Sequence, residues 1–166
     1  MQQAAETSAP GLRFIAWSRI WSPLVDDEMR AEAWQALELP DSYQHHNTEY
    51  WTLFHAGSPQ PAVSTLLHAA LMADGASARE DWLRVIEHLG LKWNDVHLPP
   101  DQLGAACEIC ACAIEREESV LVDMLASRYF LPWCDAAEQT LAAKKSPLQQ
   151  LAGAFSQDIK NLASPA

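Results

Sequence analysis

Three cysteines lie close together at Cys107, Cys110 and Cys112, and a Cys-x-x-Cys pair is one half of a typical zinc site. The second half of such a site is missing, because no further Cys-x-x-Cys and no spaced histidine pair follows. Cys107 and Cys110 instead continue, at helical spacing, an apolar stripe that begins at Leu103. We therefore expect buried thiols rather than metal ligands, with Cys112 nearer to the face of Glu108.

The other chemistry-bearing residues form no catalytic signature. The sequence predicts that the adjacent histidines His45 and His46 fall in a polar loop without a sequence-near ligand, so we expect them on the surface. No nucleophile-elbow, dinucleotide-binding or phosphate-loop motif occurs, and six glycines leave little scope for a loop that cradles phosphate. A Cys–His pair that meets only in the fold stays open. The sequence thus predicts no catalytic residue, cofactor or metal, and a protein that is not an enzyme.

The charge balance indicates which partners suit the surface. The chain has 11 Lys and Arg against 22 Asp and Glu, a net charge of −11 with neutral histidine. Such a surface repels nucleic acid and anionic lipid and favours cationic partners. The acidic residues are scattered, which is typical of a solvated surface, and a dedicated site for a basic peptide is the alternative.

The ends of the chain and its thiols indicate a cytoplasmic protein. The first ten residues, which we expect to be disordered, contain neither the basic nor the apolar region of an export signal. No later stretch approaches the ~18 apolar residues of a membrane span. Three of the four cysteines crowd one predicted helix, where disulfide geometry is poor. Reduced thiols and the absence of an export signal fit a cytoplasmic location.

The hydrophobic periodicity is helical almost throughout, and no strand pattern competes with it. A first helix, buried over most of its circumference, ends at Pro23, and a second spans residues 26–39. Asn47 or Thr48 is expected to cap a short aromatic helix. Residues 55–61, with the sequence HAGSPQP, then form the clearest loop in the chain.

A second group of helices follows this loop. We expect one helix over residues 62–72 and another that starts with a capping box of Ser77 and Glu80. Residues 92–100 form a connector that ends in two prolines, and we interpret residues 92–101 as a hinge between the two halves. Asp101 is well placed there as the N-cap of the next helix.

The predicted fold is all-α, with about nine helices in two closely packed halves, residues 1–97 and 98–166. Hydrophobic residues make up 49% of the chain and seven are tryptophan, which is enough for a core that both halves share. The two halves together are expected to form one compact domain around the hinge.

Three segments, in order, resemble one known family. Residues 49–61, EYWTLFHAGSPQP, are similar to an aromatic helix that ends in Leu-Phe before a Gly/Pro loop. Residues 98–108, LPPDQLGAACE, resemble a Pro-x-Asp-His hinge motif, and residues 129–133, YFLPW, resemble a His-Leu-x-Pro-Trp segment. Their order and spacing resemble the TorD/DmsD/NarJ family of redox-enzyme maturation chaperones, from about Gly11 to Asp158.

This resemblance implies a TorD-like helical bundle and a specific function. Such a protein is a cytoplasmic chaperone that binds the signal peptide, the apo-form, or both, of the catalytic subunit of a molybdopterin oxidoreductase. It assists cofactor insertion and assembly before export, as a monomer or a domain-swapped homodimer. A twin-arginine signal peptide brings two guanidinium groups and an apolar stretch, so its receptor needs carboxylates beside an apolar groove.

The resemblance also points to particular residues. It assigns peptide binding at the hinge to Pro100, Asp101 and Gln102, and one to two turns further along the following helix to Glu108. The opposing wall of the binding site would consist of Tyr50, Trp51 and Phe54, and Trp133 would form part of its floor. Each has a structural alternative, because a carboxylate can simply cap or solvate a helix and an aromatic side chain can simply fill the core.

Two departures from the family pattern bear on this function. Gln102 occupies the position where the family pattern has the hinge histidine, and Tyr129 occupies the position of the histidine in the third segment. Glutamine keeps a donor and an acceptor but does not titrate. The sequence therefore leaves two other interpretations open, a divergent helical scaffold without peptide binding and a small metal or redox protein that uses the clustered cysteines.

Overall fold

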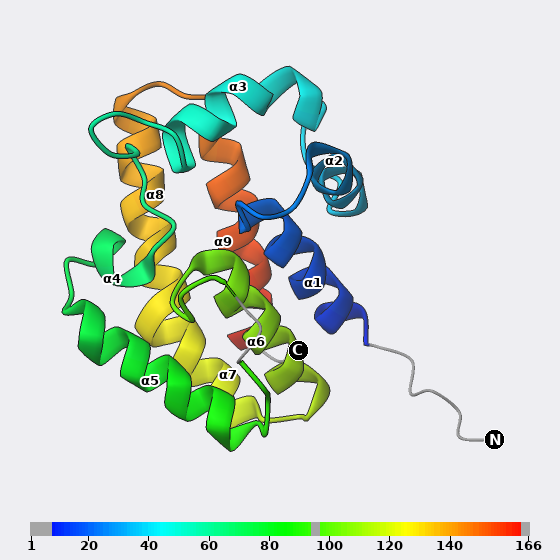
Figure 1. Ribbon diagram of the computed structural model, residues 1–166. Helices are drawn as coiled ribbons and strands as arrows, with labels where there is room; N and C mark the ends of the chain where they lie inside the picture. Colours follow the sequence, from blue (N-terminus) through cyan, green and yellow to red (C-terminus); the bar gives the residue numbers. More distant parts are fainter. Residues whose placement is uncertain (1–7, 94–96, 164–166) are drawn as a thin grey trace.

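The computed structural model describes residues 8–93 and 97–163, and within these ranges the protein is helical with no strand (Figure 1). The predicted all-α class is confirmed. A π-helical segment joins α7 to α8, and an isolated antiparallel bridge pairs Leu66 with Gln102. The α-helices are α1 (Ala9–Trp21), α2 (Asp27–Ala36), α3 (Tyr43–Phe54), α4 (Leu67–Ala70), α5 (Gly75–His88), α6 (Leu103–Glu115), α7 (Ser119–Leu125), α8 (Leu131–Ala143) and α9 (Gln149–Ala163).

Helix α1 begins earlier than the sequence predicts. The hydroxyl of Ser8 accepts a hydrogen bond from the backbone N–H of Gly11, and Pro10 lies in the first turn, where its missing N–H costs nothing. The expected disorder over residues 1–10 is therefore wrong for residues 8–10, while residues 1–7 lie outside the described ranges. The predicted end at Pro23 is confirmed, since the helix stops at Trp21.

The aromatic side chains meet in one core that both predicted halves build. Helix α1 packs against α6, and α8 packs against α9. The ring centroid of Trp21 lies 5.0 Å from that of Trp133, 5.1 Å from that of Phe54 and 5.6 Å from that of Phe155. Since α1 and α3 come from the first half and α8 and α9 from the second, burial of these rings holds the halves together.

Two helices start at residues other than those predicted. Ser42, rather than Asn47 or Thr48, caps α3, because its hydroxyl accepts from the backbone N–H of His45. Asp74 caps α5 by accepting from both the N–H and the hydroxyl of Ser77, at 2.9 and 2.7 Å. The predicted Ser77 capping box is therefore wrong, because the carboxylate three residues earlier takes the role.

The helix predicted over residues 62–72 is mostly absent, since only Leu67–Ala70 is helical. The N–H of Val63 donates to the carbonyl oxygen of Leu53 at 3.0 Å, and the carbonyl oxygen of Thr65 accepts from Leu103 at 2.7 Å. Tertiary partners thus satisfy backbone groups that a helix would have used.

Figure 1 shows α3 and α5 at opposite ends of the molecule.

The predicted second helix is shorter than expected and ends at Ala36. Helix α5 ends before Gly90, as predicted, and Gly90 adopts a φ of 65°, which favours glycine. None of the helices in the described part of the chain is long and apolar enough to cross a membrane.

Candidate functional site

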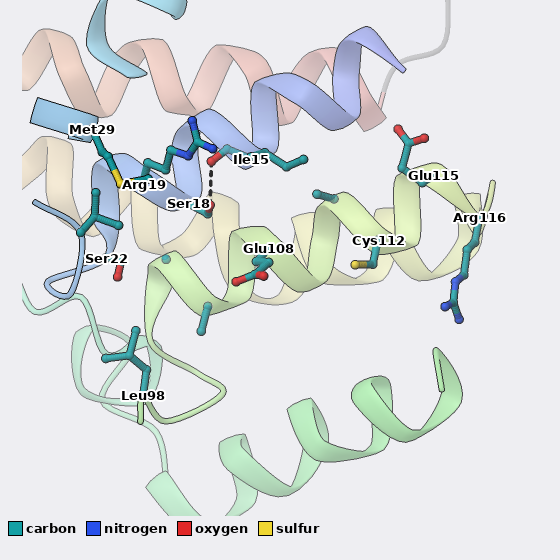
Figure 2. A pocket seen from close by; sticks show the side chains of 14 residues that line it. Ile15, Ser18, Arg19, Ser22, Met29, Leu98, Glu108, Cys112, Glu115 and Arg116 are labelled. Atoms are coloured by element: carbon teal, nitrogen blue, oxygen red, sulfur yellow. Dashed lines mark hydrogen bonds between the residues drawn. The ribbon is translucent and has the colours of Figure 1, made fainter. Parts of the chain in front are cut away.

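A groove of about 520 Å³ lies between α1 and α6 (Figure 2). Figure 2 shows side chains of α1 and the start of α2 along one side and side chains of α6 along the other. Much of the lining is apolar, with side chains contributed by Ile15, Val25, Met29, Leu98 and Ala111. The groove therefore offers an apolar surface wide enough for side chains of another molecule.

Gly104 explains why α1 and α6 come so close at one end of the groove. A Cβ atom at this position would lie 2.7 Å from the backbone nitrogen of Ser22 and 2.9 Å from the carbonyl oxygen of Ser18. Any larger residue would push the start of α6 away from the end of α1. The next residues at helical spacing on α6, Glu108 and Cys112, then face the groove.

Glu108 is the exposed carboxylate in the middle of the α6 side. Within the described residues it makes no ion pair and no side-chain hydrogen bond. Glu115, by contrast, accepts hydrogen bonds from the backbone N–H of Ser8, at 2.9 Å, and from its hydroxyl. Arg19 and Arg116 also line the groove. Glu108 is therefore the lining carboxylate best placed to accept a guanidinium group from outside.

Asp101 lies inside the protein and already has partners. Its side chain is fully buried, pairs with the imidazole of His68, and accepts from the Nε of Arg79 at 3.4 Å. The predicted N-cap role is wrong, because these contacts hold the carboxylate away from the first turn of α6. Pro100 is buried as well. Direct contact of Asp101 with a peptide would require its pairs with His68 and Arg79 to open.

Gln102 is the residue that caps α6. Its Oε1 accepts from the backbone N–H groups of Gly104, at 2.7 Å, and Ala105, at 3.2 Å. Its Nε2 donates to the carbonyl oxygen of Trp21 at 2.8 Å. Gln102 therefore holds the start of α6 against the end of α1. Of the predicted hinge, residues 94–96 lie outside the described residues.

Three predicted wall and floor residues lie in the core. Tyr50, Phe54 and Trp133 are buried, and none of them lines the groove. The hydroxyl of Tyr50 donates to the carbonyl oxygen of Ile20, and the Nε1 of Trp133 donates to that of Ser64 at 2.8 Å. Peptide contact by these side chains would require them to leave the core.

Trp51, the fourth aromatic residue predicted for peptide binding, is half-buried beside Arg30. The guanidinium carbon of Arg30 lies 4.9, 5.1 and 5.5 Å from the ring centroids of Trp51, Tyr50 and Tyr43. Arg30 is completely buried and donates to the carbonyl oxygen of Ser22 at 2.5 Å. The aromatic residues thus enclose an arginine of the chain itself through cation–π contacts.

The clustered cysteines behave largely as the sequence predicts. Cys107 and Cys110 are free thiols in the core, and burial raises the pKa of Cys110 to about 12. A thiol that stays protonated is a poor metal ligand and a poor nucleophile. Cys112 is half-buried and lines the groove next to Glu108.

The histidine pair is placed differently from the prediction. His45 and His46 belong to α3 rather than to a loop, and His46 is buried. Its Nε2 lies 3.2 Å from the Oδ2 of Asp41. The expectation of two surface histidines without a sequence-near ligand is therefore wrong for His46, because the chain turns at residues 37–42 and brings Asp41 back to it.

Sequence reasoning missed the part that α1 and α2 play in the groove. The first helix was expected to be buried over most of its circumference, yet Ile15 and Arg19 of α1 are only partly buried. Met29, at the start of α2, is exposed. The available signal was Arg19, a charged residue within a helix otherwise taken as buried.

Comparisons with known proteins identify no family for this chain. No protein-family model matches it, and searches of curated proteins and of solved structures find no significant match.

Proposed function

We propose that this protein is a cytoplasmic chaperone of the TorD/DmsD/NarJ kind. Its client is the catalytic subunit of a molybdopterin oxidoreductase, bound through the twin-arginine signal peptide, the apo-form or both, until cofactor insertion and assembly are complete. The three segments that resemble this family support the proposal, and the role itself requires no catalytic residue.

The groove between α1 and α6 is the observation that carries this proposal. An apolar lining suits the hydrophobic stretch of a signal peptide, and the exposed carboxylate of Glu108 suits an arginine beside it. The net charge of −11 attracts a basic peptide over longer distances. We place the peptide in this groove, with Glu108 as the arginine acceptor.

The predicted hinge residues act indirectly in this arrangement. Leu98 and Gly104 border the groove, while Asp101 and Gln102 hold the start of α6 from inside. Loss of either buried residue would change the shape of the groove rather than remove a direct contact. Peptide affinity and folding stability should therefore fall together at these two positions.

Titration of the full chain with a fluorescent twin-arginine peptide tests the proposal. We expect binding to weaken about tenfold in Glu108→Gln, the loss of one charge-assisted hydrogen bond. The matched control is Glu87→Gln, an exposed glutamate of α5 away from the groove, which should bind as wild type. A peptide with both arginines changed to glutamine should bind the wild-type chain and Glu108→Gln equally weakly.

Two results would contradict this function. Equal binding of the arginine and glutamine peptides to the wild-type chain would exclude recognition of twin arginines. No binding of any such peptide, together with no molybdoenzyme subunit co-purified from the native host, would instead favour a helical scaffold that does not bind peptides.

A further inference from the structure

The turn between α2 and α3 brings together three side chains that can bind a metal ion. Each of Asp41, His45 and His46 offers one ligand atom, and these atoms all lie within 4.8 Å of one another. None of the three residues lines the groove between α1 and α6. The cluster is therefore separate from the proposed peptide site.

One pair of these ligands already has the spacing that a metal requires. The Nε2 of His46 lies 3.2 Å from the Oδ2 of Asp41. Two ligands that bind zinc at 2.0–2.1 Å in a tetrahedral site are about 3.4 Å apart. The Asp41 and His45 side chains are exposed, so changes of their side-chain torsions can turn both toward an ion bound at the Nε2 of His46.

The surrounding structure holds His46 in place. Its side chain is only 8% exposed, and its ring lies against the indole of Trp34, with centroids 5.8 Å apart. The other ring, that of His45, meets the ring of His46 edge to face at 4.9 Å. The buried imidazole is thus fixed before any ion arrives, which lowers the entropic cost of binding.

The same tryptophan holds the backbone next to Asp41. The Nε1 of Trp34 donates to the carbonyl oxygen of Pro40 at 3.1 Å, the residue directly before Asp41. Asp41 itself has a φ of 60°, a left-handed conformation that aspartate adopts more readily than most residues. One side chain of α2 therefore packs against the ring of His46 and holds the backbone that precedes Asp41.

The chemistry of the three ligands selects the class of ion. Two imidazoles and one carboxylate suit zinc and the late first-row transition metals, whereas calcium and magnesium prefer oxygen ligands alone. An overall charge of −11 raises the local concentration of cations. Open positions in the coordination sphere would be filled by water, since Asp41 and His45 face solvent.

We propose that Asp41, His45 and His46 form a binding site for one divalent transition-metal ion, in the first instance Zn²⁺. The ion would fasten the α2–α3 turn to the first turn of α3. Because the ligands are protein side chains already assembled in the fold, binding should also stabilise the folded state.

Calorimetric titration of the reduced, tag-free full chain with Zn²⁺, and visible absorption with Co²⁺, test this site. We expect one ion per chain, the d–d bands of cobalt bound to nitrogen and oxygen, and a rise in Tm with added Zn²⁺. His45→Ala and Asp41→Asn, which change exposed side chains, should weaken binding at least tenfold and reduce the Tm rise at equal Zn²⁺ concentration, with unchanged urea midpoints in metal-free buffer.

Two control variants show whether other groups bind the ion. His88→Ala removes an exposed histidine that also faces a carboxylate, since its Nε2 lies 3.1 Å from the Oε1 of Glu118. Cys112→Ser removes the partly accessible thiol. Both should bind as wild type. Absent binding by the wild-type chain, affinity retained in His45→Ala and Asp41→Asn, or affinity lost in Cys112→Ser would each overturn the proposal.

Discussion

The side-chain amide of Gln102 donates a hydrogen bond of 2.8 Å to the carbonyl oxygen of Trp21, at the end of α1. The same side chain accepts from the N–H of Gly104 at 2.7 Å, at the start of α6. One residue therefore joins the end of one helix to the beginning of another that is distant in sequence. A neutral amide suits this position because the side chain there must donate one hydrogen bond and accept another at the same time.

Replacing Gln102 with alanine should lower the free energy of unfolding by about 2–4 kcal/mol, the combined cost of a lost N-cap and unpaired buried groups. Urea denaturation followed by tryptophan fluorescence measures the change. Gln150→Ala, at an exposed position of α9, is the matched control and should change stability little. A loss below about 0.5 kcal/mol in Gln102→Ala would show that these hydrogen bonds contribute almost nothing net.

Arg30 should be among the most sensitive positions in the chain. Its guanidinium group is buried and donates to the carbonyl oxygens of Ser22, at 2.5 Å, and Val25, at 3.0 Å. Arg30→Met leaves these oxygens unpaired and should destabilise the fold by about 3–5 kcal/mol.

Arg30→Lys should also destabilise, because an ammonium group cannot reproduce the planar fork of donors or its stacking on the rings. Equilibrium unfolding at pH 7 compares the two variants with Arg84→Lys, an exposed arginine of α5. Wild-type stability of Arg30→Lys would mean that only the positive charge matters at this position.

His55 should make stability depend on pH. Burial, and then the positive charge of Arg30, lowers the pKa of His55 from 6.5 to about 4. Between these values the unfolded chain binds a proton that the folded chain does not, so the free energy of unfolding falls as pH drops from about 6.5 to about 4. The contribution of His55 to this loss should reach roughly 2–3 kcal/mol.

His55→Gln tests this assignment, since glutamine can still donate to the hydroxyl of Tyr50, which lies 2.9 Å from the Nε2 of His55. Urea midpoints at pH 7 and pH 4.5 should differ less in the variant than in wild type. An unchanged difference would assign the pH dependence to other groups. His88→Gln, at an exposed histidine, should retain the full wild-type dependence.

The four free thiols should react with iodoacetamide in a fixed order. Cys107, Cys110 and Cys134 are buried and should be labelled only after denaturation, whereas the half-buried Cys112 should be labelled first. Burial also raises the pKa of Cys112, so its reaction should be slower than that of a free thiol. Mass spectrometry of the peptides identifies each site.

The same experiment bears on the groove. A twin-arginine peptide bound beside Glu108 should slow alkylation of Cys112, which lines the same groove. At equal peptide concentration it should slow this reaction less in Glu108→Gln. Rapid labelling of Cys107 in the native chain would show that the core opens far more readily than this packing indicates.

Much of the fold could be predicted from local patterns. The all-α class, the ends of α1 and α5 and the burial of Cys107 and Cys110 follow from helical periodicity, proline, glycine and apolar spacing. Helix starts were less predictable, since Asp74 and Ser42 compete with nearby residues of equal capping ability. The choice depends on where tertiary packing lets the first turn begin.

The sequence by itself determined the helical class and the thiol-rich apolar stripe of α6, because both depend on the order of residues along one helix. Only the tertiary structure decided what Asp101, Gln102 and the aromatic residues do. Their partners His68, Arg79, Trp21 and Arg30 lie in other segments, and a hydrogen bond or cation–π contact depends on distances of a few ångströms that no spacing along the chain specifies. For the same reason the groove between α1 and α6, and the meeting of Asp41 with His46, emerge only from the folded chain.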